Sequence, residues 1–382
     1  MRLFKNPELR GIVMLSLIIL ILGGVLAAST GKLEQWFNIT LFSGPKVLDK
    51  IIFVSDRSGS NEIYLMDLDG SNQKQLTQHA DVDSVPSISL SGNHIAYIGK
   101  FRGQEQVLSI GAAGGNPEQL TSATGPKKQP CYTPDGKRLS FIASGKLYVA
   151  DLNGDNPSPV LPTEHEIHSA MSSTAESRDI PAYFSYAWSP DGQGVSGVTR
   201  DHENHEILAY IPKHDSESEG EHGAGQAPPR SDLPVDRVIG YSWAAAKRVM
   251  CASLMMGKKS ALFIIDDENK RQGTLATVER QEFGRPCLSP DATMLVVPVK
   301  SKDKKNPNVL LKVDLQSGQG MPIAKGLFEN PCYSPSGDQV MATMLHDGKR
   351  DIVVVDPADG QLKQLTKDGG SFDAIWSPVS EK

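Results

Sequence analysis

The chain repeats one order of polar turns and apolar segments from Lys50 to its C-terminus. Residues 188–192 read WSPDG, and related turns occupy 132–136 (YTPDG) and 333–337 (YSPSG). An apolar strand follows each turn, and a second strand often ends near Asp-x-x-Gly before a short segment that ends Leu-Thr. A repeat of roughly forty residues with four short strands is the signature of a β-propeller blade. The pattern therefore predicts an all-β propeller.

The first repeat lacks its opening strand, and the end of the chain offers a replacement. We name the four strands of a repeat A to D, with strand A before the Ser-Pro-Asp-Gly turn. The first copy begins at strand B, residues 50–56, whereas residues 373–378 form a strand A with no repeat after it. We expect this last strand to complete the first blade, because closure removes the exposed edge of a linear array.

The number of A strands predicts the number of blades. They begin near Pro86, Pro130, Tyr186, Gly240, Pro286 and Pro331, and the closing strand at Trp376 makes seven. Six blades remain an alternative if the irregular region between Pro162 and Ser242 contains a merged unit. Residues 67–72 and 151–156 faintly resemble calcium loops, but they lack the oxygen spacing of such loops and are interpreted as hairpin turns.

Residues 50–382 resemble the C-terminal propeller of the TolB-like, WD-type repeat family. The matching segments are 188–192, 62–70 (EIYLMDLDG) and 75–77 (QLT), and the last has echoes at 119–121 and 364–366. The resemblance implies a propeller that binds proteins outside the cytoplasm. TolB itself has six blades after a globular α/β domain, whereas this sequence predicts seven blades after an anchor and a stalk. We therefore do not extend the family's role in the Tol-Pal envelope system to this chain.

The N-terminal residues predict a membrane anchor. Residues 1–10 carry Arg2, Lys5 and Arg10, and residues 11–28 are uncharged. A helix of this length spans about 27 Å, which is just enough to cross a hydrocarbon core. Because basic residues precede the segment, we expect residues 1–10 to be cytoplasmic and the anchor to be a single transmembrane helix.

This topology places the rest of the chain on the extracytoplasmic side of the cell membrane. Residues 29–49 then form a stalk, and residues 50–382 form the propeller. The alternative is a cleaved signal peptide, since Ala27 and Ala28 are small. Cleavage would give a secreted or periplasmic protein.

Charge and composition exclude one class of partner and single out one insertion. The net charge is −6 with a pI of about 5.9 and no long basic stretch, so nucleic acid is not an expected partner. Residues 162–184 and 213–236 interrupt the repeat. The second stretch is acidic, rich in Gly, Pro and Ser, and almost free of aliphatic residues, which predicts a mobile insertion.

Histidine gives the best candidate chemistry. Six of the nine histidines lie between His165 and His222, and the candidate ligands are His165 and His168, in the loop before the fourth A strand, and His202 and His205, in the next B–C turn. In a meander these two connections lie on one propeller face, where neutral imidazoles and carboxylates suit zinc or another divalent metal. Solvated surface histidines without a cofactor are the simpler interpretation.

The four cysteines are expected to be structural. Cys131, Cys287 and Cys332 occupy the same repeat position, and Cys251 lies in a different strand. Since rotation about the axis separates equivalent sites in different blades, we expect them to be too far apart for a disulfide. We predict no disulfides and small apolar packing on the inner strands.

The leading hypothesis is a membrane-anchored binding module at the cell envelope, with an envelope protein or peptide docking at the channel mouth. The sequence contains no nucleophile elbow and no phosphate-binding loop. The alternative is a metal-assisted hydrolase or lyase that uses the channel or the histidine rim. An enzyme requires titratable side chains that converge with perturbed pKa values. The A strands offer Ser, Cys, Ala and aromatic residues rather than acids or histidines, which favours binding.

Overall fold

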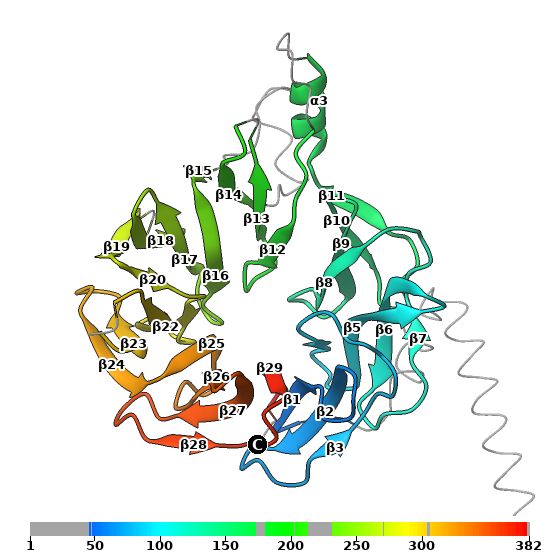
Figure 1. Ribbon diagram of the computed structural model, residues 1–382. Helices are drawn as coiled ribbons and strands as arrows, with labels where there is room; N and C mark the ends of the chain where they lie inside the picture. Colours follow the sequence, from blue (N-terminus) through cyan, green and yellow to red (C-terminus); the bar gives the residue numbers. More distant parts are fainter. Residues whose placement is uncertain are drawn as a thin grey trace, which may run out of the picture. The chain divides into compact units, whose positions relative to one another are not determined.

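Within the described residues, seven antiparallel sheets surround a common axis, so the predicted all-β propeller has seven blades rather than six (Figure 1). The computed structural model describes residues 46, 48–172, 180–201, 203–212, 231–269, 271–303 and 306–379. Each blade is a meander whose first strand lies beside the axis, as the repeat predicts. In blade 6 this inner strand is split into two short strands that pair with the same neighbour.

The strands of each blade are given from the inner strand outward. Blade 1 contains β29 (Ser371–Trp376), β1 (Lys50–Ser55), β2 (Glu62–Asp67) and β3 (Lys74–Gln75). Blade 2 contains β4 (Ser87–Ile88), β5 (His94–Phe101), β6 (Gln104–Gly111) and β7 (Glu118–Gln119). Blade 3 contains β8 (Lys127–Tyr132), β9 (Arg138–Ala143), β10 (Lys146–Asp151) and β11 (Ser158–Leu161). Blade 4 contains β12 (Ser185–Trp188), β13 (Gly194–Arg200), β14 (Glu206–Pro212) and β15 (Ser231–Val235).

The remaining three blades follow the same order. Blade 5 contains β16 (Arg237–Trp243), β17 (Val249–Met256), β18 (Lys259–Asp266) and β19 (Arg271–Glu279). Blade 6 contains β20 (Gln281–Phe283) and β21 (Cys287–Leu288), then β22 (Met294–Ser301), β23 (Val309–Asp314) and β24 (Gly320–Lys325). Blade 7 contains β25 (Leu327–Tyr333), β26 (Val340–His346), β27 (Lys349–Val355) and β28 (Leu362–Gln364).

Blade 1 is closed by the end of the chain, as predicted. Strand β29 pairs antiparallel with β1 and places Ile375 opposite Ile52. Two further backbone bonds extend the pair beyond the strand: the N–H of Ser377 donates to the carbonyl of Lys50 at 3.0 Å, and the N–H of Asp49 donates to that of Pro378 at 3.0 Å. The ring is therefore sealed without an exposed edge between its first and last strands.

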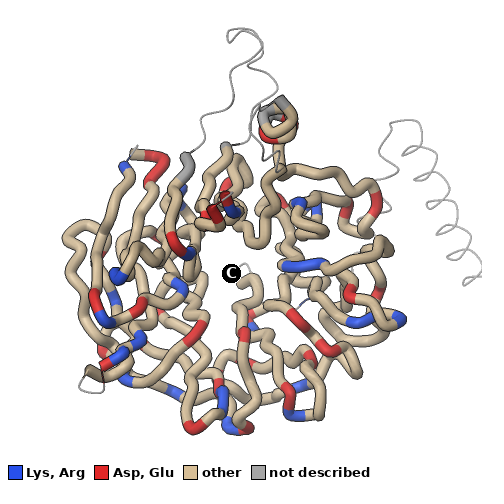
Figure 2. Tube along the Cα trace, turned by 45° about the horizontal axis from the view of Figure 1, so that its top comes forward, with Lys and Arg blue, Asp and Glu red and all other residues tan. Residues whose placement is uncertain are grey.

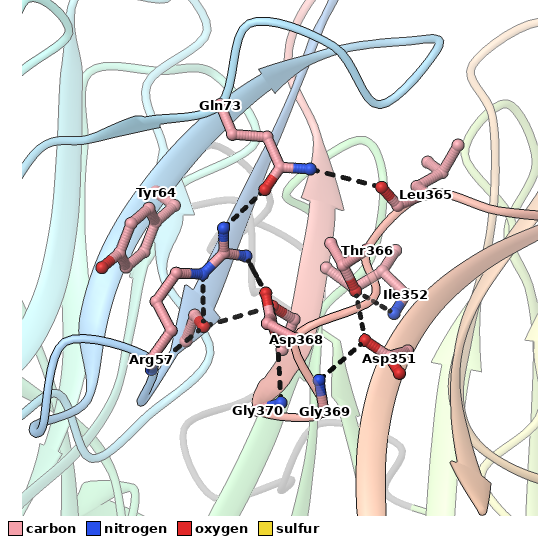
Figure 3. A network of polar contacts seen from close by, with 12 residues as sticks. Arg57, Tyr64, Gln73, Asp351, Ile352, Leu365, Thr366, Asp368, Gly369 and Gly370 are labelled. Atoms are coloured by element: carbon pink, nitrogen blue, oxygen red, sulfur yellow. Dashed lines mark hydrogen bonds and ion pairs between the residues drawn. The ribbon is translucent and has the colours of Figure 1, made fainter.

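A polar network secures the opposite end of this strand pair (Figure 3). Arg57, in the turn after β1, forms an ion pair with Asp368 and donates to Ser371 Oγ at 2.8 Å and to Gln73 Oε1 at 2.6 Å. Its guanidinium carbon also lies 4.7 Å from the ring centroid of Tyr64. The Arg57 side chain thus links blade 1 to Asp368, in the segment that leads into β29.

The repeated Leu-Thr segment has a structural explanation. The N–H of Ile63 donates to Thr77 Oγ1 at 2.9 Å, and this hydroxyl donates to the buried carboxylate of Glu62 at 2.6 Å. Thr121 and Thr366 make the corresponding bonds in blades 2 and 7, where the hydroxyl donates to Gln106 Oε1 and Asp351 Oδ1. The threonine therefore fixes the outer strand to strand C and satisfies a buried polar group.

The Ser-Pro-Asp-Gly turn is also built by side chains. Ser189 Oγ donates to Asp191 Oδ1 at 2.6 Å and accepts the N–H of Gly194 at 2.9 Å. Ser289 makes the same two kinds of bond in blade 6. The motif that identified the repeat in the sequence is therefore the connection that joins the inner strand to strand B.

The turns between strands C and D lock neighbouring blades together. Gly154 has a φ of 86°, and a Cβ atom added there would lie 1.9 Å from the carbonyl oxygen of Leu120 in blade 2. Gly70 approaches Leu365 of blade 7 in the same way, at 2.9 Å. The Asp-x-x-Gly turn of one blade thus packs on the Leu-Thr segment of the previous blade, which only a residue without a side chain allows.

Seven apolar clusters fill the interfaces between neighbouring blades. At the closing interface, Phe53 and Met66 of blade 1 contact Met341 and Ile352 of blade 7. Both faces of the central strands are buried, as in β13, where only the last residue is exposed. The core is therefore divided among the blade interfaces, as expected for blades that pack face to face.

Two irregular segments differ from the sequence expectation. Residues 162–184 include a helix, α3 (Glu164–Ser172), where a loop was expected. Thr163 and Glu166 form a capping box, because Thr163 Oγ1 accepts the N–H of Glu166 at 3.2 Å and Glu166 Oε2 accepts the N–H of Thr163 at 2.7 Å. In the predicted insertion 213–236, residues 231–235 form β15, and residues 213–230 lie outside the described residues.

The predicted anchor and most of the stalk, residues 11–28 and 29–49, cannot be compared with the fold. Only residues 46, 48 and 49 of these two segments are described. Among the residues that are described, no helix has both the length and the apolar character needed to cross a membrane. The membrane anchor remains a prediction from the sequence.

Candidate functional site

The inner strands share an irregularity that places polar residues beside the axis. The register between strands A and B shifts in blades 3, 7 and 1. One residue at each shift has a positive φ: 49° for Gln129, 47° for Asn330 and 50° for Asp373. Such a backbone is uncommon for residues other than Gly, and strained positions of this kind cluster at functional sites. The equivalent residue of blade 6, between β20 and β21, is Arg285.

These residues reach the next blade in the ring. Asn330 Nδ2 donates to Asp373 Oδ1 at 2.7 Å, which joins blade 7 to blade 1. The N–H of Tyr186 in blade 4 donates to Gln129 Oε1 of blade 3 at 3.2 Å. At these register shifts, the side chains of Asn330 and Gln129 therefore form hydrogen bonds to the inner strand of the next blade.

Arg285 packs closely against a glycine of the previous blade. A Cβ atom added to Gly240 would lie 2.8 Å from the Cβ of Arg285, so the absence of a side chain at Gly240 makes room for it. Arg285 is exposed, and within the described part of the chain its guanidinium forms no ion pair or hydrogen bond. An exposed guanidinium on a fixed backbone can bind a carboxylate through two parallel hydrogen bonds.

The pKa of the Asp373 carboxyl group is raised. Burial raises the pKa of its carboxyl group, and the hydrogen bond from Asn330 together with the positive charges of Arg285 and Arg350 opposes that rise. The expectation that the inner strands offer no acids is therefore wrong, since Asp373 belongs to β29. Two titratable side chains on inner strands, Arg285 and Asp373, rather than an apolar lining, mark this part of the axis.

Two thiols complete this surface. Cys287 on β21 and Cys332 on β25 lie on neighbouring inner strands, and the N–H of Tyr333, the residue after Cys332, donates to Cys287 Sγ at 3.3 Å. Interaction with the Cys332 thiol lowers the pKa of Cys287, whereas the same interaction and burial raise the pKa of Cys332. We call the surface formed by Arg285, Cys287, Asn330, Cys332 and Asp373 the axial wall.

The cysteine expectations are met in part. Cys131, Cys287 and Cys332 lie on inner strands, and all four cysteines are free thiols. Cys287 nevertheless reaches the neighbouring blade, since its Sγ lies 3.3 Å from the backbone nitrogen of Tyr333, the residue after Cys332. The two thiols also influence each other's pKa.

The predicted histidine site is only partly described. His202 and the side chain of His165 lie outside the described residues. His168 is exposed on α3, and Nδ1 of His205, in the B–C turn, lies 3.3 Å from Asp201 Oδ2 and 3.6 Å from Glu203 Oε2. The described residues contain no group of three or more His, Cys, Asp or Glu residues arranged for a metal ion. The metal site stays a prediction.

A separate cavity of about 550 Å³ lies between the outer strand of blade 2 and blade 3. Phe141 and Tyr148 line it with stacked rings, and the buried Lys127 reaches it while donating to the carbonyls of Ala123 and Gly125. Its lysine is satisfied by backbone oxygens, so the cavity offers less directed chemistry than the axial wall.

Charges of both signs are mixed among the described residues that Figure 2 draws. Lys, Arg, Asp and Glu are interspersed around the ring (Figure 2). This distribution agrees with the small negative net charge.

Comparison with known proteins supports the resemblance found in the sequence. A family model described as the TolB beta propeller domain matches residues 45–166. A TolB homolog of Chlorobium luteolum is 31% identical, with 27% of this chain and 34% of the relative covered. A TolB homolog of Chlorobium chlorochromatii is 26% identical, with 25% and 31% covered. The match therefore spans about a third of the length of either relative.

Solved structures agree on the fold. A protein from Lactobacillus plantarum has a TM-score of 0.56 at 13% identity and covers 88% of this chain and 100% of its own. A putative 6-phosphogluconolactonase from Bacteroides fragilis has a TM-score of 0.53 at 14% identity, with 86% and 95% covered. At such identities the likeness concerns the architecture alone. Residues 45–166 are thus similar to the TolB beta propeller domain, and the described part of the chain has the β-propeller architecture.

Proposed function

We propose that this protein is a binding module whose axial wall receives a segment of an envelope protein or peptide. The observation that carries the proposal is the exposed guanidinium of Arg285, which Gly240 accommodates and which has no anionic partner among the described residues. Asn330 and Asp373 lie on the next two inner strands and offer an amide and a carboxyl group.

The chemistry of these three side chains defines the expected ligand. A carboxylate, from an acidic side chain or a chain end, would pair with Arg285. A backbone N–H of the same segment would donate to the Asp373 carboxyl group. We expect a peptide with at least one acidic group, and binding that weakens as the salt concentration rises.

The location of the module is part of the proposal. The uncharged segment 11–28 after a basic end would hold the propeller on the extracytoplasmic side of the cell membrane, and cleavage of that segment would release it. Protease added to intact spheroplasts should digest residues 50–382, whereas protection of these residues until lysis would contradict this location.

Peptide selection tests the binding site. The purified full chain would be screened against a random peptide library, and the affinities of the selected peptides would be measured for wild type and Arg285→Ala. We expect acidic peptides whose affinity falls at least about tenfold in the variant, in line with a hydrogen-bonded charge. Arg271→Ala is the matched control, because Arg271 is exposed on the outer strand β19.

Two results would overturn the binding proposal. One is a library that yields no peptide enriched over the control resin. The other is a set of peptides whose affinity is equal for wild type and Arg285→Ala. The raised pKa of Asp373 also suits a general acid, which is the feature that favours an enzyme in the axial wall. Hydrolysis of a selected peptide that stops in Asp373→Asn would favour the hydrolase alternative.

A further inference from the structure

The thiols of Cys287 and Cys332 form a pair that the fold does not require. Each is the next-to-last residue of the inner strand of its blade, and each is partly exposed. At this position Ser87 accepts the N–H of Tyr132 at 3.2 Å and Ser242 accepts that of Leu288 at 3.3 Å.

Serine therefore makes the same bond between blades that Cys287 makes to the N–H of Tyr333 at 3.3 Å. Sulfur is not needed for this structural role.

The pair occurs at one interface of the ring. The residues at the same repeat position are Ser87, Cys131, Ala187, Ser242, Cys287, Cys332 and Ile375. Cys131 has Ser87 on one side and Ala187 on the other, so it has no thiol neighbour at this level. Blades 6 and 7 alone place two thiols on neighbouring inner strands at this position.

The surroundings of the pair favour reaction at one sulfur. The neighbouring Cys332 thiol, the hydrogen bond from the N–H of Tyr333 and the charge of Arg285 all stabilise the thiolate of Cys287. A thiolate is the nucleophile in the oxidation of cysteine, and a second thiol in contact with it can resolve the first product.

We propose that Cys287 and Cys332 are a redox-modification site, which a peroxide or a small-molecule disulfide oxidises to a disulfide between blades 6 and 7. With hydrogen peroxide, the Cys287 thiolate attacks one oxygen, the O–O bond breaks, and hydroxide leaves as the sulfur becomes a sulfenic acid. The Cys332 sulfur then attacks that sulfur and expels the hydroxyl group, which leaves as water with the proton released by the Cys332 thiol. Two electrons pass from the pair of thiols to the peroxide.

Oxidation would have two consequences, of which the second rests on the proposed function. The disulfide would join β21 to β25 covalently and raise the melting temperature of the ring. It would also fix the two strands that flank Arg285 and Asn330, so that peptide affinity changes with the redox state.

Thiol counting and mass spectrometry test the modification directly. The reduced full chain would be exposed to hydrogen peroxide or oxidised glutathione, denatured and alkylated. We expect the number of alkylatable thiols to fall from the four of the sequence by two, with a peptide that links Cys287 to Cys332 and its disappearance after dithiothreitol.

Matched variants distinguish the pair from the other cysteines. The double variant Cys131→Ser/Cys251→Ser should still form the disulfide, and Cys287→Ser should not. Cys287→Ser should fold, because blades 2 and 5 carry serine at this position, and circular dichroism checks this.

As a second measurement, Cys332→Ala should slow the alkylation of Cys287 in the native protein several-fold, since the interaction with the Cys332 thiol that stabilises the thiolate is lost. The proposal would be overturned by four alkylatable thiols after oxidation, by a disulfide that contains Cys131, or by oxidation of Cys287 that stops at the sulfinic acid. None of these results depends on whether a peptide binds the axial wall.

Discussion

Blades 1 and 7 each contain four antiparallel strands in the same arrangement, but the two blades are assembled in different ways. In blade 7 a Ser-Pro-Ser-Gly turn joins β25 to β26, and Ser334 Oγ donates to Asp338 Oδ1 at 2.7 Å within that turn. In blade 1 the corresponding strands, β29 and β1, come from the two ends of the propeller and have no turn between them. Side chains and backbone bonds at both ends of this pair replace the missing connection.

The difference shows where the fold needs specific polar contacts. Lys50 and Ser377 secure one end of the closing pair, because the N–H of Lys50 donates to Ser377 Oγ at 2.8 Å. Arg57 secures the other end through Asp368 and Ser371. In a blade formed from consecutive residues, chain connectivity supplies this constraint, and its turn carries only local bonds. The predictions below separate these two kinds of assembly.

Removal of residues 371–382 should have the largest effect. It deletes β29, exposes the edge of β1 and uncovers the apolar cluster that contains Phe53. We expect loss of the cooperative unfolding transition and aggregation, measured by differential scanning calorimetry and light scattering. Removal of residues 380–382 alone is the control and should leave the transition unchanged. A truncated protein that unfolds cooperatively at the wild-type temperature would refute closure as the source of stability.

Arg57→Ala should destabilise the closed ring by about 2 kcal/mol. The variant loses the bonds to Gln73 and Ser371 and the ion pair with Asp368, whose side chain is 21% exposed. Chemical denaturation measures the change. Arg57→Lys keeps the charge but not the planar fork, and it should recover less than half of the loss. A change below about 0.5 kcal/mol in the alanine variant would mean that the backbone pairing alone closes blade 1.

Thr77→Val and Thr366→Val should cost similar amounts in the two blades. Each substitution removes the acceptor for a buried N–H and the donor to a buried carboxylate, Glu62 in blade 1 and Asp351 in blade 7. We expect a loss of about 1–2 kcal/mol in the free energy of unfolding for each. Thr→Ser at the same sites is the control, and because it keeps the hydroxyl group it should retain most of the wild-type free energy of unfolding. If the loss at Thr77 differed from the loss at Thr366, the closure by β29 would affect the stability of the outer strands of blade 1.

The smallest expected effect is a pH dependence at Asp373. Burial raises the pKa of Asp373 in the folded protein above the ordinary value of 3.8, so the neutral acid is favoured on folding. Its contribution to stability is therefore complete at low pH and declines as the pH rises through the folded-state pKa. Asp373→Asn should gain stability relative to wild type as the pH rises from 3.8, with a plateau once the carboxyl is ionised in both states. Urea denaturation across this range measures it, and a pH-independent difference would contradict the shift.

The repeat made most of the fold predictable from the sequence. The strand A at residues 373–378 and the missing strand A before Lys50 together predicted the closure that the pairing of Ile375 with Ile52 confirms. Such motifs are local, and each blade repeats them. The helix α3 was missed although its signal is present, since Thr163 and Glu166 have the spacing of a capping box.

The axial wall was harder to predict because it depends on contacts between blades. Arg285, Asn330 and Asp373 differ in residue type and share only their distance from the following turn. Comparison of the residues three positions before the last strand residue of each A strand could have aligned them. The approach of Cys287 to the strand that carries Cys332 and Tyr333 depends on how closely the inner strands converge, which no sequence motif encodes.

The hydrogen bond between Asp49 and Pro378 places the entry and the exit of the propeller side by side at one end of blade 1. A mechanical load applied between the two ends of the chain would therefore act across β29 and β1 at their shared edge. Because the bonds of an antiparallel pair run perpendicular to the strands, such a load would separate them one bond at a time instead of shearing them together. Tension applied between residues 49 and 378 would open the ring at the place where it closes.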